Sequence, residues 1–185
     1  MLTIEFNGVL MKFNTLPSLF SPNALDAGTR AMLSCVQFSK DDKVLDLGCG
    51  YGFVGIYAAK LIGAEHVTMV DIDPAAVAKA EENACLNDVA ALRIFQSDGF
   101  RNVDDTGYTL ILSNPPYHTD FSVAKHFIEK GFNRLVIGGK MLFVTKRKEW
   151  YKNKFIAIFG GAAIHEIDGY FVFAAEKRSA AYSKK

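Results

Sequence analysis

Residues 44–55 read VLDLGCGYGFVG, and this stretch decides the fold. The apolar segment VLDL has the length and composition of a buried strand, and the residues from Phe53 to Leu61 have those of a helix. Four glycines punctuate the stretch, Gly48, Gly50, Gly52 and Gly55. Glycines between a strand and a helix allow a tight turn and let the backbone approach a ligand closely. The stretch therefore predicts a strand, a ligand-binding loop and a helix.

The pattern continues along the rest of the chain, where short apolar segments alternate with helical ones. Strands are expected at 43–48, 66–71, 91–96, 109–114 and 140–145, and helices at 53–61, 74–87, 122–135 and 150–159. The last two strands, 163–167 and 170–176, are joined by Asp168-Gly169, a hairpin turn sequence. The prediction is a doubly wound α/β fold whose seven-stranded, mostly parallel sheet ends in an antiparallel hairpin.

The N-terminal region precedes this alternation. Residues 2–13, LTIEFNGVLMKF, form two alternating runs joined by Asn7-Gly8, which predicts a short β-hairpin, and residues 24–38 contain a helix. A length of 185 residues without repeats or linkers fits one domain, 1–185. Residues 41–185 are expected to form its catalytic core.

Composition narrows the function classes. No run approaches the ~18 apolar residues that a membrane span needs, and the N-terminus lacks the pattern of a secretory signal. The three cysteines lack metal-ligand spacing and indicate reduced thiols in a cytoplasmic protein without a metal site. Residues 140–154 hold six basic and one acidic residue, which suits either phosphate binding or a solvated surface.

The cofactor class follows from the acidic residues around the glycines. Gly50, Gly52 and Gly55 match a dinucleotide-binding pattern, and Asp71, about twenty residues on, could hold ribose hydroxyls in either cofactor class. Asp46 discriminates, because its carboxylate suits the ammonium group of a methionine moiety and would repel a pyrophosphate. Asp98, after the third strand, could accept a hydrogen bond from an adenine amino group. These residues favour S-adenosylmethionine.

The sequence NPPY at 114–117 ends the strand beside the first one, at the point where strand order is expected to reverse. Asn114 supplies a side-chain carbonyl and Pro115 a backbone carbonyl, and two acceptors can hold the N–H groups of a planar amine and aim its lone pair at a methyl group. Tyr117 can stack on a base. We therefore expect Asn114, Pro115 and Tyr117 to act on the amine, with Asn114 also beside the cofactor.

The motifs DLGCGYG, VDID, SDGF and NPPY, in this order, resemble class I S-adenosylmethionine-dependent amino-methyltransferases, which have a Rossmann-like fold. FSPNALDAGTRAML and NPPYH are similar to the small methyltransferase-domain family that includes the small-subunit ribosomal RNA guanine-N2 methyltransferase. The resemblance implies methylation of guanine N2 in ribosomal RNA. It also implies that residues 1–40 cover the cofactor site, with Thr29 near the methionine end.

That family's common bacterial form carries a second, degenerate copy of the domain, and this chain has one. The resemblance therefore leaves both a monomer and a homodimer open. Other functions also remain: methylation of a protein glutamine N5 or of adenine N6, and, from different classes, a dehydrogenase or a non-catalytic RNA-binding module.

Overall fold

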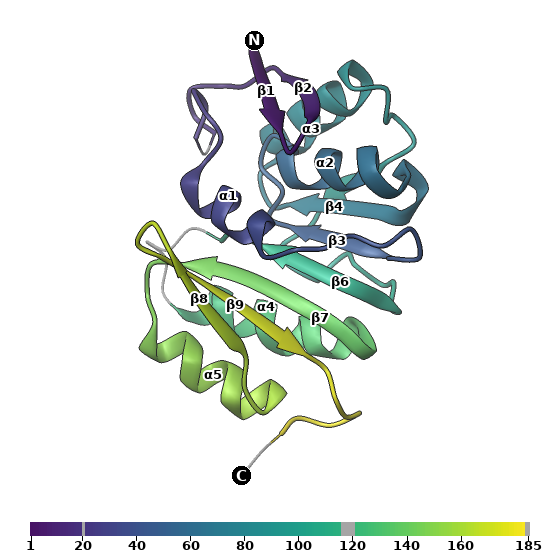
Figure 1. The fold of residues 1–185 in the computed structure, drawn as a ribbon. Coiled ribbons are helices and arrows are strands. Elements are labelled where there is room, and N and C mark those ends of the chain that lie inside the picture. Colours follow the sequence, from purple (N-terminus) through teal and green to yellow (C-terminus); the bar gives the residue numbers. More distant parts are fainter. Residues whose placement is uncertain (20, 116–120, 184–185) are drawn as a thin grey trace.

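A computed structural model describes residues 1–19, 21–115 and 121–183. Seven strands form one sheet in the order β5-β4-β3-β6-β7-β9-β8, and β1 and β2 form a separate hairpin. The strands of the large sheet are β3 (Val44–Leu47), β4 (Val67–Asp71), β5 (Arg93–Gln96), β6 (Tyr108–Ser113), β7 (Leu135–Thr145), β8 (Ala163–Ile167) and β9 (Tyr170–Glu176). The predicted doubly wound sheet with an N-terminal hairpin is confirmed (Figure 1).

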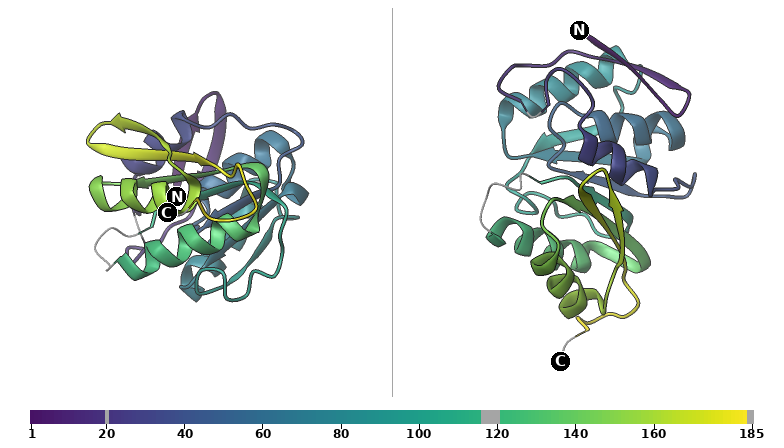
Figure 2. Two further views of the ribbon diagram at one scale, coloured as in Figure 1. Left: turned by 90° about the horizontal axis from the view of Figure 1, so that it is seen from below. Right: turned by 60° about the vertical axis from the view of Figure 1, so that its left-hand side comes forward.

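The helices cover both faces of this sheet. They are α1 (Ala27–Ser34), α2 (Phe53–Ile62), α3 (Pro74–Leu86), α4 (Phe121–Arg134) and α5 (Glu149–Phe159), with a short 3-10 turn, η1 (Ala64–His66). Successive side chains of a strand point to opposite faces, so Val44 packs in the core beneath α1, α2 and α3 whereas Leu45 packs in the core beneath α4 and α5. Figure 2 shows the two helical layers from two further directions.

Strand order reverses at the centre of the sheet. β3 pairs in parallel with β4 on one side and with β6 on the other, because the chain crosses over after β5. The loops that leave the carboxyl ends of β3 and β6 diverge at this point and leave a crevice, where α/β proteins of this kind bind ligands.

Both predicted hairpins form with the expected turns. Asn7 and Gly8 have φ values of 49° and 79° between β1 (Leu2–Phe6) and β2 (Val9–Phe13), and Asp168 and Gly169 have φ values of 51° and 78° between β8 and β9. Positive φ at both central residues matches the right-handed twist of the flanking strands. β9 then pairs antiparallel with β7, so the hairpin joins the sheet and β8 forms its edge.

Two elements, α1 and β7, begin three or more residues away from the position expected from the sequence. α1 begins only at Ala27, because the Asp26 side chain accepts a hydrogen bond from the Thr29 N–H at 2.7 Å and caps the helix there. β7 begins at Leu135 rather than at 140, and its pairing with β6 shifts register between Leu135, which lies opposite Tyr108, and Lys140, which lies opposite Leu110. The pair Gly138-Gly139 would be expected to interrupt a strand. The Gly138 N–H, however, donates to the Lys177 carbonyl, and the Lys177 N–H donates to the Gly139 carbonyl, so both glycines remain in the sheet.

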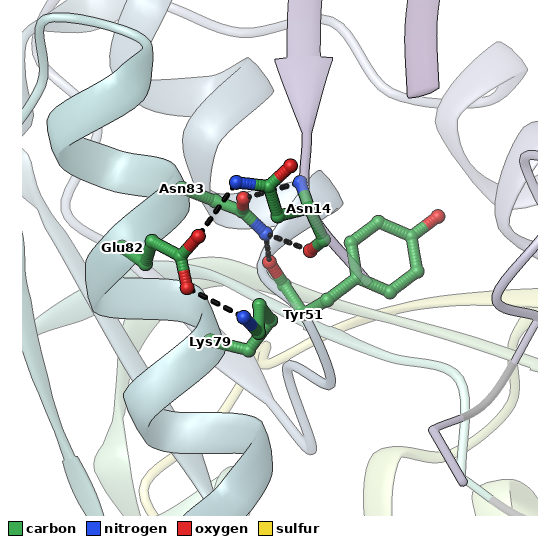
Figure 3. A network of polar contacts seen from close by, with 5 residues as sticks. All are labelled: Asn14, Tyr51, Lys79, Glu82 and Asn83. Carbon is green, nitrogen blue, oxygen red and sulfur yellow. Dashed lines mark hydrogen bonds and ion pairs between the residues drawn. The ribbon is translucent and has the colours of Figure 1, made fainter. Parts of the chain in front are cut away.

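An asparagine on α3 connects the end of the N-terminal hairpin with this helix and with the glycine-rich loop (Figure 3). The fully buried Asn83 side chain donates to the Asn14 and Tyr51 carbonyls, both at 2.9 Å, and accepts from the Asn14 N–H at 2.8 Å. Asn14 in turn donates to Glu82 at 2.6 Å. Because Tyr51 belongs to the glycine-rich loop, this network also holds that loop in place.

Candidate active site

A cavity of about 410 Å³ lies at the carboxyl ends of the central strands, where the strand order reverses. Its walls come from the loops after β3, β4, β5 and β6 and from the start of α1. Eight of the residues singled out in the sequence line it: Thr29, Asp46, Gly48, Gly50, Asp71, Asp98, Asn114 and Pro115. Residues far apart in the chain thus meet around one space large enough for a small organic ligand.

The glycine-rich loop forms the floor of this cavity. The N–H groups of Gly48 and Cys49 both donate to the Val70 carbonyl at 2.9 Å, which ties the loop to the neighbouring strand. Gly48 and Gly50 have φ values of 79° and 55°, and a Cβ added to either would meet no atom within 4 Å. The backbone is therefore bare on the side that a ligand would approach.

Gly52 differs from these two glycines, because it does not line the cavity. It has a φ of 99°, and a Cβ there would lie 2.9 Å from Met69 Cε and 3.2 Å from Ala80 Cβ. Gly52 immediately precedes α2 and packs closely against β4 and α3, which explains why a residue without a side chain is needed at this position.

Asp46 is the most deeply buried charged group of the site, with 3% of its surface exposed. Its Oδ2 accepts a hydrogen bond from the Gly55 N–H at 2.8 Å. Burial raises the pKa of this carboxyl, the Gly55 hydrogen bond lowers it and the nearby Asp71 raises it, so that the pKa is about 7. A cation in the cavity would compensate the buried carboxylate.

Asp71 is held by backbone donors on both oxygens. Its Oδ2 accepts from the Gly50 N–H at 2.8 Å, and its Oδ1 accepts from the Asp73 N–H at 3.0 Å. Each carboxylate oxygen keeps a second lone pair, so the group remains able to accept hydrogen bonds from a pair of hydroxyls.

Asp98 lines the cavity from the loop after β5. Its side chain is 56% exposed and 3.8 Å from the Arg101 guanidinium. An exposed pair at this distance contributes little to stability. The carboxylate is therefore available at the rim of the cavity.

Asn114 is tied to the start of α1. Its Nδ2 donates to Asp26 Oδ2 at 2.8 Å and to Thr29 Oγ1 at 3.0 Å. A carboxylate only accepts, so the NH₂ end of the amide must face Asp26. Asn114 Oδ1 is buried and has no hydrogen-bond partner among the residues that the structure describes. An oriented acceptor without a partner is the most unusual polar group of the site.

Pro115 lines the cavity directly after Asn114, whereas Tyr117 lies outside the described residues. Two lining residues have roles that the sequence reading missed. Asp26 was expected only as part of the segment that lies over the cofactor near its methionine end, although it also orients Asn114. Ile72 lines the cavity with 61% of its surface exposed, and an apolar residue directly after Asp71 was the available signal.

None of the helices in the described part of the chain combines the length and the apolar composition needed to cross a membrane. Within the same residues, no three side chains of His, Cys, Asp or Glu gather in a way that could hold a metal ion.

Curated relatives agree with the motifs. Ribosomal RNA small subunit methyltransferase C of Psychromonas ingrahamii is 30% identical over 167 residues, covering 88% of this chain and 47% of the relative. Ribosomal RNA large subunit methyltransferase G of Shewanella denitrificans is 32% identical over 169 residues, covering 88% of this chain and 44% of the relative. The chain thus spans about half the length of the curated relatives it matches.

A solved structure agrees with the fold. The T. thermophilus 16S ribosomal RNA guanine-N2 methyltransferase, in complex with AdoMet and guanosine, matches with a TM-score of 0.83 and 26% identity, covering 96% of this chain and 50% of that one. Residues 10–174 match the methyltransferase small domain family. The sequence motifs, the sheet order and these matches lead to one conclusion: the chain belongs to the methyltransferase small domain family.

Proposed function

We propose that this chain transfers a methyl group from S-adenosylmethionine to an exocyclic amino nitrogen of a nucleobase in RNA, and that the nitrogen is guanine N2 of small-subunit ribosomal RNA. The observation that carries the proposal is the Asn114 amide, whose oxygen has no partner among the described residues and whose NH₂ end is fixed by Asp26 at the wall of the cavity. Such an acceptor suits a substrate that donates an N–H group.

The other lining residues fit the cofactor. The Asp46 carboxylate would accept the methionine ammonium group, and this cation would remove the cost of burying the charge. Asp71 would accept from the ribose hydroxyls, and Asp98 from the adenine amino group. Ile72 would cover the adenine ring at the rim. Gly48 and Gly50 would leave room for the cofactor against the loop, and Thr29 would lie near the methionine end.

S-adenosylmethionine supplies a methyl group on a positively charged sulfur, so the reaction needs a nucleophile in line with the carbon–sulfur bond more than a strong base. Asn114 Oδ1 and the Pro115 carbonyl would each accept one N–H of the target amine. Two acceptors on one nitrogen turn its lone pair out of the ring and toward the methyl. As the nitrogen–carbon bond forms and the carbon–sulfur bond breaks, the nitrogen releases one proton to water. We propose that Tyr117 stacks on the base.

RNA is favoured as the substrate class by the relatives. The two curated relatives are named as ribosomal RNA methyltransferases, one of the small and one of the large subunit, and the T. thermophilus structure holds guanosine. Large-subunit RNA is therefore the second candidate target. A protein glutamine amide presents an equally delocalised nitrogen, and it is the alternative outside RNA.

We propose a cytoplasmic protein that acts as a monomer or a homodimer.

The test uses cells that lack this protein. Purified protein and methyl-labelled cofactor are added to an extract of these cells, and the product is digested with ribonuclease or with protease. Label released only by ribonuclease supports the RNA substrate. Label released only by protease would replace it with a protein substrate, and no label in any macromolecule would remove the proposed activity.

A further inference from the structure

The basic stretch in the C-terminal half does not form one surface. Lys140 lies in the middle of β7 and lines a separate cavity with residues of the C-terminal hairpin. Lys154 forms an ion pair with Glu129 of α4. Lys152 is an exposed residue of α5. The other three basic residues are Lys146, Arg147 and Lys148, whose exposed side chains directly follow the end of β7 at Thr145. We call these three residues the basic edge.

The basic edge lies at the carboxyl ends of the parallel strands, as the candidate active site does. β7 runs parallel to β6 and β3, so all three strands end at this edge, and their arrowheads point the same way in Figure 1. The Lys146 ammonium is 4.9 Å from the centre of the Tyr170 ring. Tyr170 in turn packs closely against Gly28: a Cβ atom added to Gly28 would lie 2.8 Å from Tyr170 Cε1. Gly28 is two residues from Asp26, which binds Asn114, so the basic edge adjoins the amine end of the cavity.

Aromatic rings hold the three cations. The Arg147 guanidinium is 5.1 Å from the centre of the Phe121 ring, and the Lys148 ammonium is 5.3 Å from that of Phe171. Phe121 itself stacks on Trp150 with a centroid distance of 4.3 Å and an interplanar angle of 14°. A cation over a ring is attracted to it and restricted in position. Side chains ordered in advance lose less freedom when they bind a partner.

Within the part of the chain that the structure describes, no carboxylate forms an ion pair with the middle or the end of this cluster. Among residues 1–19, 21–115 and 121–183, none lies within ion-pair distance of Arg147 or Lys148. A run of lysines that only aids solubility would need neither an aromatic support under each cation nor a place beside the cavity. These two features together favour a binding surface over a solvated one.

We propose that the basic edge binds the phosphodiester backbone of the RNA strand whose base enters the cavity. This inference rests on the proposed function, because a base can reach Asn114 only if its own sugar and phosphates pass over the neighbouring rim. Arg and Lys are the side chains that neutralise phosphates, and they do so without regard to base sequence. The basic edge therefore holds the strand, and the cavity selects the base.

Three variants test this surface. The first, K146Q/R147Q/K148Q, removes three positive charges from the basic edge. The second, K60Q/K130Q/R178Q, removes the same number and kind of charges from exposed positions elsewhere. The third, K146R/R147K/K148R, keeps the charge of the basic edge and changes only the shape of the side chains. The probe is a fluorescein-labelled single-stranded RNA of mixed sequence, and its binding is measured by fluorescence anisotropy at several salt concentrations.

The basic-edge variant should bind this RNA roughly tenfold or more weakly than the parent near physiological salt, because counterion release by three residues is lost. The slope of log affinity against log salt should become shallower by about 2, since each phosphate contact to a single strand contributes ~0.7. The second variant should keep most of the parent's affinity, and the third should keep its salt slope. Calorimetric binding of S-adenosylmethionine should be equal in all four proteins, which shows that each is folded.

Equal RNA affinity of the parent and the basic-edge variant would overturn the inference, and so would an equal loss in the second variant. A parent protein that binds an oligoglutamate of matching charge more tightly than the RNA would indicate that the partner of the basic edge is an acidic protein and not an RNA strand.

The methyl-transfer assay on ribosomal RNA separates this inference from the proposed function. A parent that transfers label, with a basic-edge variant equal to it at all RNA concentrations, would contradict the basic edge alone. A parent that transfers none would contradict the proposed function.

Discussion

The Asn114 amide donates to the Asp26 carboxylate at 2.8 Å across 88 residues of sequence. The same oxygen, Asp26 Oδ2, accepts from the Thr29 N–H at 2.7 Å and so begins α1. One carboxylate thus connects a helix cap to the orientation of the amide that we propose to hold the target amine. The start of α1 and the end of β6 therefore act together in the site.

Replacing Asp26 separates these two roles. In D26S the serine can still cap α1, but it is too short to reach Asn114. The amide then keeps only the Thr29 hydroxyl, which can donate or accept and so does not fix which end of the amide faces α1. The loss of a hydrogen bond to a charged group predicts a fall in kcat of roughly tenfold to a hundredfold, with the Kd of S-adenosylmethionine within about threefold of the parent. D26N, which keeps one acceptor of the same length, should lie between the two. Methyl-transfer kinetics and calorimetry check these values, and an unchanged kcat in D26S would show that Asp26 serves only as a cap.

The buried Asp46 makes stability depend on pH. In the unfolded chain its carboxyl has a pKa near 3.8, and burial raises the pKa to about 7 in the fold. Between these values the folded protein retains a proton that the unfolded chain releases, so this group's contribution to the free energy of unfolding falls from pH 4 to pH 7. D46N cannot ionise and keeps the acceptor for Gly55. Its ligand-free form should be more stable than the parent at pH 8, by up to about 4 kcal/mol, and equally stable near pH 4. Urea denaturation at both pH values measures this, and an equal difference at pH 4 and pH 8 would contradict the role of ionisation.

The same carboxyl predicts how cofactor binding depends on pH. An ammonium group binds the carboxylate form of Asp46, so below pH 7 binding must first displace a proton. The affinity for S-adenosylmethionine should fall by up to about tenfold per pH unit below 7 and level off above it. D46N should bind the cofactor weakly at every pH and without this slope. Titration calorimetry from pH 5.5 to pH 8.5 provides the test, and a parallel slope in parent and variant would assign it to another group.

The two glycines of the loop should respond differently to alanine. G50A places its Cβ in open space within the cavity wall, so it should weaken S-adenosylmethionine binding by about tenfold or more and cost about 1 kcal/mol of stability. G52A meets Met69 and Ala80 at a φ of 99°, and it should cost roughly 1–3 kcal/mol while the folded fraction binds the cofactor near the parent's affinity. Thermal denaturation and calorimetry on both variants check the contrast. The reverse pattern would mean that Gly52, not Gly50, faces the ligand.

Removing Asn83 should loosen the N-terminal hairpin and the glycine-rich loop together. N83A leaves the Asn14 N–H without its acceptor, and it leaves the Asn14 and Tyr51 carbonyls without their donor. The protein should therefore lose roughly 2–4 kcal/mol of stability. N23A, an alanine substitution at an exposed asparagine, is the matched control and should cost less than about 0.5 kcal/mol. Denaturation measures both, and a cost for N83A no larger than that for N23A would show that the network of Figure 3 contributes little.

The regular part of the fold could be predicted from local patterns. Asn7-Gly8 and Asp168-Gly169 specify their hairpins because few other pairs tolerate positive φ at both positions. Parallel strands read as short apolar runs, so the order of strands and helices was predictable as well. The start of β7 was not, because Gly138-Gly139 suggests a break that pairing with Lys177 overrides.

Only those site residues that belong to one short sequence motif could be predicted from the sequence. The glycine-rich loop and Asn114 stand in short patterns whose chemistry is local. The bond between Asp26 and Asn114 joins residues 88 positions apart and leaves no periodic signal in the sequence. The aromatic rings beneath the basic edge likewise come from α4 and β9, which only the folded chain brings together.

The central claim is that this chain methylates guanine N2 in ribosomal RNA through Asn114. The most direct measurement is mass spectrometry of nucleosides from small-subunit ribosomal RNA, taken from cells without the protein and incubated with S-adenosylmethionine and either the parent or N114A. We predict that N2-methylguanosine appears with the parent and falls at least a hundredfold with N114A, although both bind the cofactor equally. Equal formation of N2-methylguanosine by N114A, or a methylated nucleoside other than this one with the parent, would contradict the account.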